Sequence, residues 1–334
     1  MIFQSNGPTD HSKVVEAIQP RISTAMNESL LHEFTTEEVS KALKQMHTKK
    51  APSSGGMPPL FYQHFWPLVS NCVIKTVLDF LNHGLLPPNF NDTHIVLILK
   101  VKNPTKITQY RPISLSNVVS RLASKVLANR LKRLFSQIIS ENQSAFMSNR
   151  LITDNVLVAF ETIHHISQKR SGKVGEMALK LDMSKAYDRV EWGCLEGIMR
   201  KMGFAEEWVT IMMRCVSTVK YSVKINGKPR GCITPTRGLR QGDPLSPYLF
   251  LICAEGLSTL LKQSVDQGSL KGIAACQGAP EISHLLFADD GLIFCRATRE
   301  DCMALEQVLE TYEHASGQQL NRDKTSIFFS HNTP

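Results

Sequence analysis

The chain has 334 residues, of which 42% are hydrophobic and 20% charged, so it can bury a substantial core. Its 38 Lys and Arg exceed its 30 Asp and Glu, and the resulting net charge of +8 favours a polyanionic partner. The eight Cys lack metal-binding spacing, no apolar stretch reaches membrane-spanning length, and the first residues do not resemble a secretory signal. These features argue against a zinc cluster, a disulfide framework and a membrane partner. They predict a globular intracellular protein, either nuclear or cytoplasmic.

In chain order, the first predicted elements are helices that flank a loop. Thr35-Thr36-Glu37-Glu38 is typical of a helix start, and residues 49–59 form a loop rich in Pro, Gly and Ser. Residues 60–86 then have the apolar spacing of a helix, and residues 95–99 have the composition of a short buried strand. Apolar residues recur at helical spacing from 121 to 139, with the basic residues largely on the other face, which predicts an amphipathic basic helix.

Basic residues are concentrated in this part of the chain. No acidic residue lies between Asp92 and Glu141, whereas nine Lys and Arg do. One sign of charge on an intact apolar periodicity predicts a folded basic surface, so nucleic acid becomes the leading partner. A solvated charged face without a partner stays open as the alternative. The nucleic-acid contacts expected on the basic helix are Arg121, Lys125, Arg130, Lys132 and Arg133.

Strand and helix patterns alternate from residue 177 onward. Residues 177–181 are apolar and end at Asp182, and residues 221–225 alternate up to Asn226-Gly227, which predicts a type I′ hairpin. Further helices are predicted at 192–202, 208–216, 244–261 and 299–315. Helices and hairpins that alternate on one sheet give an α+β fold class.

Carboxylates mark a candidate site in this second part. Phe287-Ala288-Asp289-Asp290 interrupts two apolar runs, the pattern of a hairpin with both acids at its tip. Asp is common in turns, so the pair alone predicts only a turn. Neighbouring strands would bring Asp182 to the same point, and cations must neutralise such a cluster. Two Mg²⁺ ions suit oxygen ligands and support phosphoryl transfer without a nucleophilic side chain.

These residues occur in an ordered series of motifs that resembles a known family. The chain is similar to the reverse transcriptase domain of a LINE-type non-LTR retrotransposon of the plant kind, from about Lys41 to Ser330. The motifs are QYRPISL (109–115), SKVLANRL (124–131), QSAF (143–146), LDMSKAYDRVEW (181–192), RGLRQGDPLSPYLF (237–250), FADD (287–290), QLN (319–321) and Lys324-Thr325.

The resemblance implies a right-hand polymerase fold, with fingers and a palm whose antiparallel sheet packs on helices. The expected parts are an N-terminal extension at 1–40, fingers at 41–175 and a palm at 176–334; a thumb is expected to be absent. The implied activity is that of an RNA-directed DNA polymerase, which copies an RNA template from a DNA primer with dNTPs. Two Mg²⁺ ions are the implied cofactors, with Mn²⁺ as a substitute. The oligomeric state stays open.

In the palm, the resemblance assigns roles to five residues. Asp182, Asp289 and Asp290 would be metal ligands. Tyr187 would be the steric gate that excludes a ribose 2′-OH, although its ring also fits a core aromatic. Lys324 would protonate the leaving pyrophosphate.

In the loops and fingers, the resemblance assigns nucleotide contacts. Lys100 and Arg111 would bind the incoming triphosphate, although a surface salt bridge is the alternative for Arg111. Gln241 and Gly242 would contact the nucleotide and template, since Gly permits close backbone approach.

Several positions depart from the family pattern. Pro52 to Gly56 lacks the usual Asp and one Pro, Leu99 replaces a Pro, and Met147 to Asn149 replaces a Val-Pro-Gly turn. These departures place template grip in doubt but not the acids. An inactive nucleic-acid-binding remnant is therefore the alternative function, and an RNA-templated RNA polymerase is a third interpretation against which Tyr187 argues.

Overall fold

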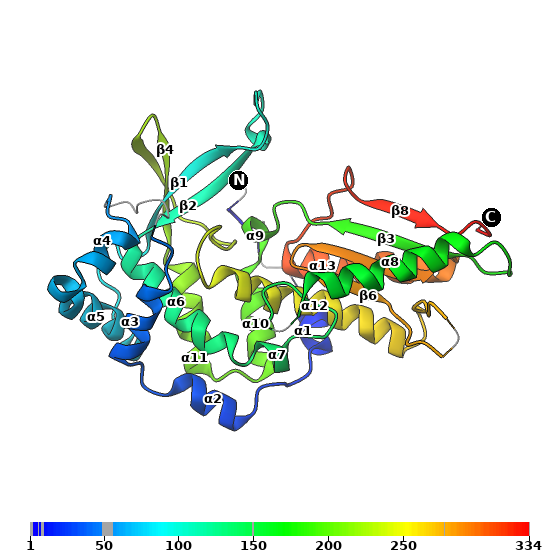
Figure 1. The fold of residues 1–334 in the computed structure, drawn as a ribbon, viewed down its shortest axis with the longest axis horizontal. Helices are drawn as coiled ribbons and strands as arrows, with labels where there is room; N and C mark the ends of the chain where they lie inside the picture. The colour runs from blue at the N-terminus through cyan, green and yellow to red at the C-terminus, as the bar shows by residue number, and fades with distance from the viewer. Residues whose placement is uncertain are drawn as a thin grey trace. The chain divides into compact units, whose positions relative to one another are not determined.

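Two sheets and their surrounding helices make up the described chain (Figure 1). The computed structural model describes residues 3–5, 7, 10–48, 56–148, 150–276 and 278–333, so most of the predicted 49–59 loop and part of the Met147 to Asn149 turn lie outside the described residues. The chain divides into two compact units. The first contains Met1–Gln4, Ser23–Arg133 and Phe204–Tyr248, and the second contains Ser5–Ile22, Leu134–Gly203 and Leu249–Pro334.

The first unit contains most of the helices predicted for the first part of the chain, including the one with the capping signal. Its helices are α2 (Thr24–Leu31), α3 (Thr36–Lys44), α4 (Pro59–His64), α5 (Trp66–His83), α6 (Val118–Lys132) and α11 (Glu206–Ser217). The Thr35 side chain accepts a hydrogen bond from the Glu38 N–H, and the Glu38 carboxylate accepts one from the Thr35 N–H, which confirms the predicted start of α3. Helices α3, α5 and α6 pack on one another and bury Leu43, Phe80 and Leu127.

The sheet of the first unit has the strand order β2-β1-β4-β5. Its strands are β1 (Asp92–Leu99), β2 (Tyr110–Ser116), β4 (Lys220–Ile225) and β5 (Lys228–Ile233), and a short 3₁₀ turn, η1 (Ile107–Gln109), precedes β2. Asn226 and Gly227 have φ angles of 49° and 80°, which confirms the predicted hairpin. Strand β4 pairs in parallel with β1, so the 220–233 hairpin belongs to a different sheet from β3, β6 and β7. The prediction that the elements after residue 177 share one sheet is therefore wrong.

The predicted buried strand at 95–99 is buried only over its first half. Ile95 is 3% exposed, whereas Ile98 and Leu99 are 52% and 55% exposed. Strand β4 pairs only with Asp92–Ile95, so the rest of β1 has β2 as its sole neighbour in the described sheet. An isolated pair of strands has no further strand or helix packed on it to cover its side chains, which explains the exposure.

The second unit has an antiparallel sheet of order β6-β7-β3-β8. Its strands are β3 (Glu176–Asp182), β6 (His284–Phe287), β7 (Asp290–Arg296) and β8 (Ser326–Phe329). Its helices are α1 (Ser12–Ala17), α7 (Phe135–Ile138), α8 (Ile152–Gln168), α9 (Ala186–Arg189), α10 (Trp192–Met202) and α13 (Arg299–Ser316). Helix α12 (Ser246–Asp266) begins in the last residues of the first unit and continues in the second.

Helices cover both faces of this sheet (Figure 1). Ala178 of β3 packs against Ala159 and Ile166 of α8, while the adjacent Met177 lies 4.0 Å, sulfur to sulfur, from Cys302 of α13. Adjacent strand residues point to opposite faces, so α8 and α13 lie on opposite sides. An antiparallel sheet packed on helices is the α+β arrangement predicted for a palm. No helix in the described ranges is both long and apolar enough to span a bilayer.

The two compact units do not follow the predicted boundaries at residues 40 and 175. The 220–233 hairpin groups with the first unit because β4 pairs with β1, and α8 groups with the second because it packs on β3 and β6. The predicted N-terminal extension is divided, since α1 packs on α10 and α13 of the second unit while α2 belongs to the first. The division into fingers and palm stays a prediction.

Candidate active site

Three carboxylates meet at one end of the second unit's sheet. The antiparallel register of β3 and β7 places Asp182 directly opposite Asp290. Phe287 pairs with Asp290, which leaves Ala288 and Asp289 as the two residues of the turn between β6 and β7. The structure therefore brings together the three acids that the strand pattern predicted to be neighbours.

The acids interact electrostatically. Burial raises the pKa of the Asp289 carboxyl, and the negative charges of Asp290 and Asp182 raise it further. A backbone hydrogen bond and the Lys324 ammonium act in the opposite direction, but the net pKa remains above the ordinary value. Like charges are therefore close enough to disfavour one another's ionised form, which is the condition that a bound cation would relieve.

Asp182 is held from a segment that follows α13. The Asn321 side chain donates a hydrogen bond of 3.0 Å to Asp182 Oδ1, and the Asn321 backbone N–H donates one of 2.8 Å to the Asp182 carbonyl. Lys324 Nζ lies 3.3 Å from Asp182 Oδ2, with its side chain 65% exposed. Sequence reasoning predicted a role for Lys324 but missed Asn321, whose only signal was its place in the QLN motif.

The donor set fits a hard divalent cation, because all three side chains offer carboxylate oxygens. Within the described ranges, no three His, Cys, Asp or Glu side chains are already arranged as a metal cage. Both Asp182 oxygens accept hydrogen bonds, one from Asn321 and the other from Lys324. The chemistry of the donors thus fits a metal, although Lys324 contacts one of the Asp182 oxygens in this structure.

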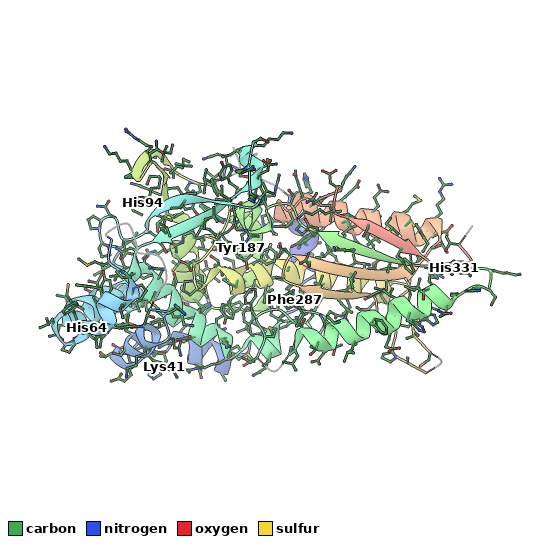
Figure 2. The ribbon with its side chains drawn as sticks, turned by 45° about the horizontal axis from the view of Figure 1, so that its top comes forward. Lys41, His64, His94, Tyr187, Phe287 and His331 are labelled. Atoms are coloured by element: carbon green, nitrogen blue, oxygen red, sulfur yellow. The ribbon has the colours of Figure 1, made fainter. Side chains whose placement is uncertain are left out.

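Tyr187 of α9 (labelled in Figure 2) interacts electrostatically with Asp289. Its ring stacks on Phe250 with centroids 4.9 Å apart and planes inclined by 15°. Burial raises the pKa of the Tyr187 hydroxyl, and the charge of Asp289 raises it further. The ring is thus both packed as a core aromatic and close to the acid cluster, so the two sequence interpretations are compatible.

The predicted nucleotide contacts of the loops and fingers lie in the first unit. Lys100 immediately follows β1, and Arg111 pairs across the β1–β2 hairpin with Ile98. The Gln241 carbonyl accepts a hydrogen bond of 3.1 Å from the Ser114 N–H of β2. Gly242 has a φ of 103°, a conformation that residues with a Cβ rarely adopt. The predicted site residues are thus divided between the units: the acids, Tyr187 and Lys324 lie in the second, and these four nucleotide contacts lie in the first.

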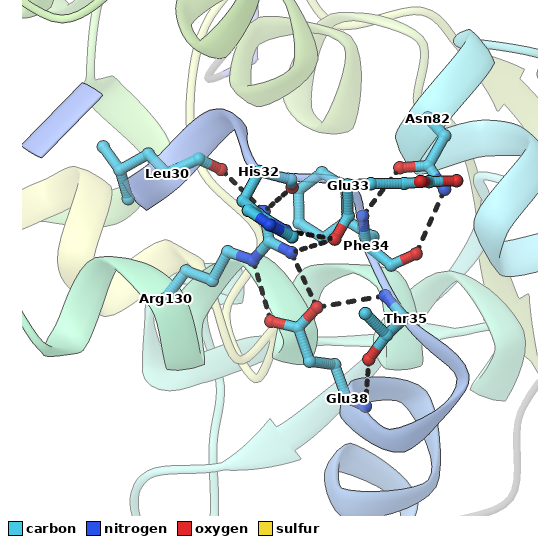
Figure 3. A network of polar contacts seen from close by, with 8 residues as sticks. All are labelled: Leu30, His32, Glu33, Phe34, Thr35, Glu38, Asn82 and Arg130. Atoms are coloured by element: carbon cyan, nitrogen blue, oxygen red, sulfur yellow. Dashed lines mark hydrogen bonds and ion pairs between the residues drawn. The ribbon is translucent and has the colours of Figure 1, made fainter. Parts of the chain in front are cut away.

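Arg130 is an internal structural residue, so its prediction as a nucleic-acid contact is wrong (Figure 3). Its side chain is 5% exposed, and its Nε and Nη2 donate to the two Glu38 oxygens at 2.8 and 2.7 Å. The guanidinium lies 3.6 Å over the Phe34 ring centroid. The remaining acceptors are the carbonyl oxygens of Leu30, His32 and Glu33. All of its donor nitrogens are therefore engaged inside the first unit.

Arg121 is also buried, at 6% exposure, so its prediction as a nucleic-acid contact is wrong too. Burial lowers the pKa of its guanidinium, while Asp243 and Tyr62 act to raise it, and its Nε and Nη2 have no hydrogen-bond partner in the part of the chain described. Helix α6 is mostly buried because both α3 and α5 pack on it, which its own apolar spacing cannot reveal. Lys132 and Arg133 are exposed and Lys125 is partly buried, so these three stay candidates.

The sequence analysis missed an exposed basic hairpin. The sequence has no acidic residue between Glu207 and Asp243, a signal of the same kind as the one used for residues 92–141. The hairpin formed by β4 and β5 lies within that interval, and its basic side chains are exposed and form no salt bridge with any described residue. They are Lys220, Lys224, Lys228 and Arg230.

Comparisons with known proteins agree on one family. A family model described as "Reverse transcriptase (RNA-dependent DNA polymerase)" matches residues 100–333. The Transposon TX1 uncharacterized 149 kDa protein of Xenopus laevis is 27% identical over 307 residues, which are 92% of this chain and 23% of that protein. The Pol polyprotein of the R2DM element of Drosophila melanogaster is 24% identical over 314 residues, 92% of this chain and 28% of that protein. The chain thus spans about a quarter of these relatives. The uncharacterized mitochondrial protein AtMg01250 of Arabidopsis thaliana is 61% identical over 66 residues, 20% of this chain and 54% of that protein.

Proposed function

Because the chain belongs to the reverse transcriptase (RNA-dependent DNA polymerase) family and is homologous to non-LTR retrotransposon proteins, we propose that it extends a DNA primer by copying RNA. One observation carries this proposal: the register of β3 and β7 sets Asp182 opposite Asp290 and beside the Asp289 turn. Three carboxylates at adjoining strand ends are the oxygen donors that nucleotidyl transfer needs.

Members of this family generally use divalent metal ions, and we propose two Mg²⁺ ions here, with Mn²⁺ as a substitute. Asp182, Asp289 and Asp290 would hold them, and the bound ions would activate the primer 3′-hydroxyl and stabilise the leaving pyrophosphate. The protein's own contribution is to fix the three carboxylates through the β3 and β7 ladder before substrate binds.

Neighbouring side chains of the second unit complete the proposed site. The Tyr187 ring, held by stacking on Phe250, would exclude the 2′-OH of a ribonucleotide and so select dNTPs. Lys324, which already lies 3.3 Å from Asp182, would give a proton to the pyrophosphate as it leaves.

In the first unit, we propose that Lys100 and Arg111 bind the triphosphate from their shared hairpin. The planar guanidinium of Arg111 suits bidentate phosphate binding. Gln241 and Gly242 would contact nucleotide and template, with the backbone of their loop fixed to β2 by the Ser114 N–H.

Primer extension on an RNA template with Mg²⁺ tests this function. Loss of metal charge stabilisation is worth several kcal/mol, and about 1.4 kcal/mol is tenfold, so Asp289→Asn should slow extension at least about 100-fold. Asp323→Asn is the matched control, because its exposed carboxylate lies beside Lys324 but outside the cluster. Extension that survives Asp289→Asn would refute the metal assignment. Ribonucleotides in the same assay test Tyr187, since an RNA-templated RNA polymerase would incorporate them.

Nucleic-acid binding without polymerisation is the second candidate function. The observation that favours it is the exposed basic surface of the first unit, to which the β4–β5 hairpin adds Lys220, Lys224, Lys228 and Arg230. RNA affinity should fall steeply with salt, and replacing the four cations by Ala should reduce the log–log slope by about 0.7 for each single-strand phosphate that the hairpin no longer neutralises. Salt-insensitive binding would contradict it. Tight binding combined with no extension would favour this candidate over the polymerase.

A further inference from the structure

The hairpin that carries the acids has a backbone partner along its outer edge. Strand β6 is the edge strand of its sheet, and the segment from Asn142 to Ala145 runs beside it. The Leu286 N–H donates to the Asn142 carbonyl at 2.8 Å, and the Ser144 N–H donates to the Leu286 carbonyl at 3.1 Å. Gln143 thereby forms a parallel bridge with Leu286. Gln143 to Ala145 belong to the QSAF motif, to which the proposed function gives no role.

The Gln143 side chain reaches from this bridge to the turn. Its Oε1 accepts hydrogen bonds from the Ala288 N–H at 3.0 Å and from the Ala145 N–H at 2.9 Å, and the residue is 2% exposed. Both partners are backbone donors, so only the amide oxygen satisfies them and the orientation of the amide is fixed. Its Nε2 has no hydrogen-bond partner among the residues that the structure describes.

Ala288 needs such a restraint. Its φ of 55° places it in the left-handed region, which residues with a Cβ rarely occupy unless their surroundings enforce it. Ala288 immediately precedes Asp289, so a change in its backbone conformation would redirect the Asp289 carboxylate. Since the Ala288 N–H is bonded to Gln143, the conformation of the turn depends on a side chain more than 140 residues away in sequence.

We infer that Gln143 is a positioning residue, which holds the Ala288-Asp289 turn so that the Asp289 carboxylate stays directed toward Asp290 and Asp182. It acts through the backbone of Ala288 and touches neither substrate nor metal. The inference rests on the proposed role of Asp289 as a metal ligand. It adds a residue from outside both acid-bearing strands to the set that fixes the site.

The amide of Gln143 suits this task better than a carboxylate would. Glutamate could accept the same two hydrogen bonds, but it would place another negative charge next to the Asp289 turn, where Asp290 and Asp182 already repel. A neutral acceptor supplies the hydrogen bonds without that repulsion. Gln143→Glu should therefore keep the turn ordered while disturbing its electrostatics, which separates the two effects.

The matched control is Asn142→Leu. Asn142 Nδ2 donates a 2.8 Å hydrogen bond to the His284 carbonyl, at the end of β6 away from the turn. The test variant is Gln143→Met, which approximates the side-chain volume but removes the acceptor. Gln143→Asn, which withdraws the oxygen by one methylene, serves if the Met variant does not fold. Asn142→Leu removes a side-chain hydrogen bond to β6 itself, whereas Gln143→Met removes the one to the turn that follows β6.

Two measurements on the full chain test the inference without activity. Mn²⁺ binding followed by electron paramagnetic resonance should weaken about tenfold in Gln143→Met, within the range for residues that orient metal ligands. Hydrogen exchange of a peptide covering 286–290 should speed up in Gln143→Met and stay protected in Gln143→Glu. Asn142→Leu should leave both readouts within about twofold of the wild type, even if its melting temperature falls.

Unchanged exchange at 286–290 and unchanged Mn²⁺ affinity in Gln143→Met would overturn the inference. An equal effect of Asn142→Leu on both readouts would also overturn it, because the role of Gln143 would then be general stability. If the wild type binds no Mn²⁺ that Asp289→Asn removes, the proposed function fails instead. Exchange still decides on Gln143 in that case, since it reports the turn whether or not metal binds.

Discussion

Replacing Arg130 by Met tests whether helix α6 carries a structural or a nucleic-acid-binding arginine. The guanidinium is bound to both Glu38 oxygens and three carbonyl groups and lies over the Phe34 ring (Figure 3). Met approximates the length and apolar volume of the arginine stem, so the substitution removes the donors without leaving a large cavity.

The expected loss of unfolding free energy follows from the Glu38 carboxylate that the substitution leaves without its partner. Removing one partner of a buried ion pair costs about 3–5 kcal/mol, because the other charge is left uncompensated. The Glu38 side chain is 22% exposed and can recover some hydration, which places the loss near the lower end, at about 3 kcal/mol. Burial raises the pKa of Glu38, but the bonds from Arg130 and the Thr35 N–H outweigh it and the net pKa is lowered. In the variant, Glu38 loses the hydrogen bonds and the charge of Arg130 and keeps only the Thr35 N–H bond and the influence of Arg133.

Urea unfolding followed by circular dichroism measures the effect. With an m-value of about 3 kcal/mol/M, the midpoint should fall by about 1 M. Arg133→Met on the same helix is the control: its exposed side chain should cost less than about 0.5 kcal/mol but reduce the salt dependence of RNA binding. The reasoning is refuted if Arg130→Met loses under 1 kcal/mol and weakens RNA binding as Arg133→Met does.

Three further substitutions have expected outcomes. Burial lowers the pKa of His284 to about 4 from an ordinary 6.5. The neutral side chain therefore contributes its full stability above pH 6.5, and this contribution is lost as the pH falls toward 4. Between pH 8 and 4, urea titrations should show the wild type losing about 3 kcal/mol more stability than His284→Gln. Gly317 ends α13 at a φ of 73°, and a Cβ there would lie 2.5 Å from the Arg189 carbonyl oxygen, so Gly317→Ala should cost about 1–3 kcal/mol in thermal melts. With EDTA present, Asp289→Asn should leave the fold at least as stable as the wild type in thermal melts, because it removes a charge that Asp290 and Asp182 repel, although solvent screens an exposed carboxylate and keeps the gain small. Asp323→Asn should be neutral, and a destabilised Asp289→Asn would contradict the repulsion within the cluster.

The sequence predicted best those elements that depend on local patterns of apolar and turn residues. Helix α10 has the predicted bounds Trp192–Met202, and α13 extends the predicted 299–315 by one residue. The Asn226-Gly227 hairpin followed from turn chemistry alone, because both residues tolerate positive φ. Each of these elements depends on interactions between residues close in sequence, which is why a single sequence reveals them.

Long-range partners were not predictable in this way. Strands β1 and β4 are more than 100 residues apart in sequence and pair in parallel, and nothing in either strand specifies that neighbour. The burial of α6 likewise depends on distant parts of the chain, because α3 and α5 pack on it. Arg130 is bound to Glu38 of α3, whereas Arg121, on the opposite side of the helix, interacts with Tyr62 of α4 and with Asp243. Charge at helical spacing indicates a face but not what packs on it.

The sequence predicted that the three acids lie together because Asp182 ends a strand and Asp289-Asp290 lie at a hairpin turn. Paired strands bring such positions to the same end of a sheet. Gln143 and Asn321 had no comparable signal. An amide that acts through backbone groups leaves no spacing or charge pattern, and only the folded hydrogen bonds identify it.

The acid cluster is held by groups on both of its sides. Asn321 and Lys324 donate to Asp182 from the segment after α13, and Gln143 fixes the turn before Asp290 from the segment before α8. Carboxylates this close oppose the fold, so their arrangement depends on such donors and on the rigid β3–β7 ladder. Of these supports, only Lys324 carries a charge and is largely exposed, so it is the one that an arriving cation can displace without breaking the backbone frame. The backbone frame therefore sets where the carboxylates lie, while the Lys324 ammonium offsets part of the negative charge around Asp289.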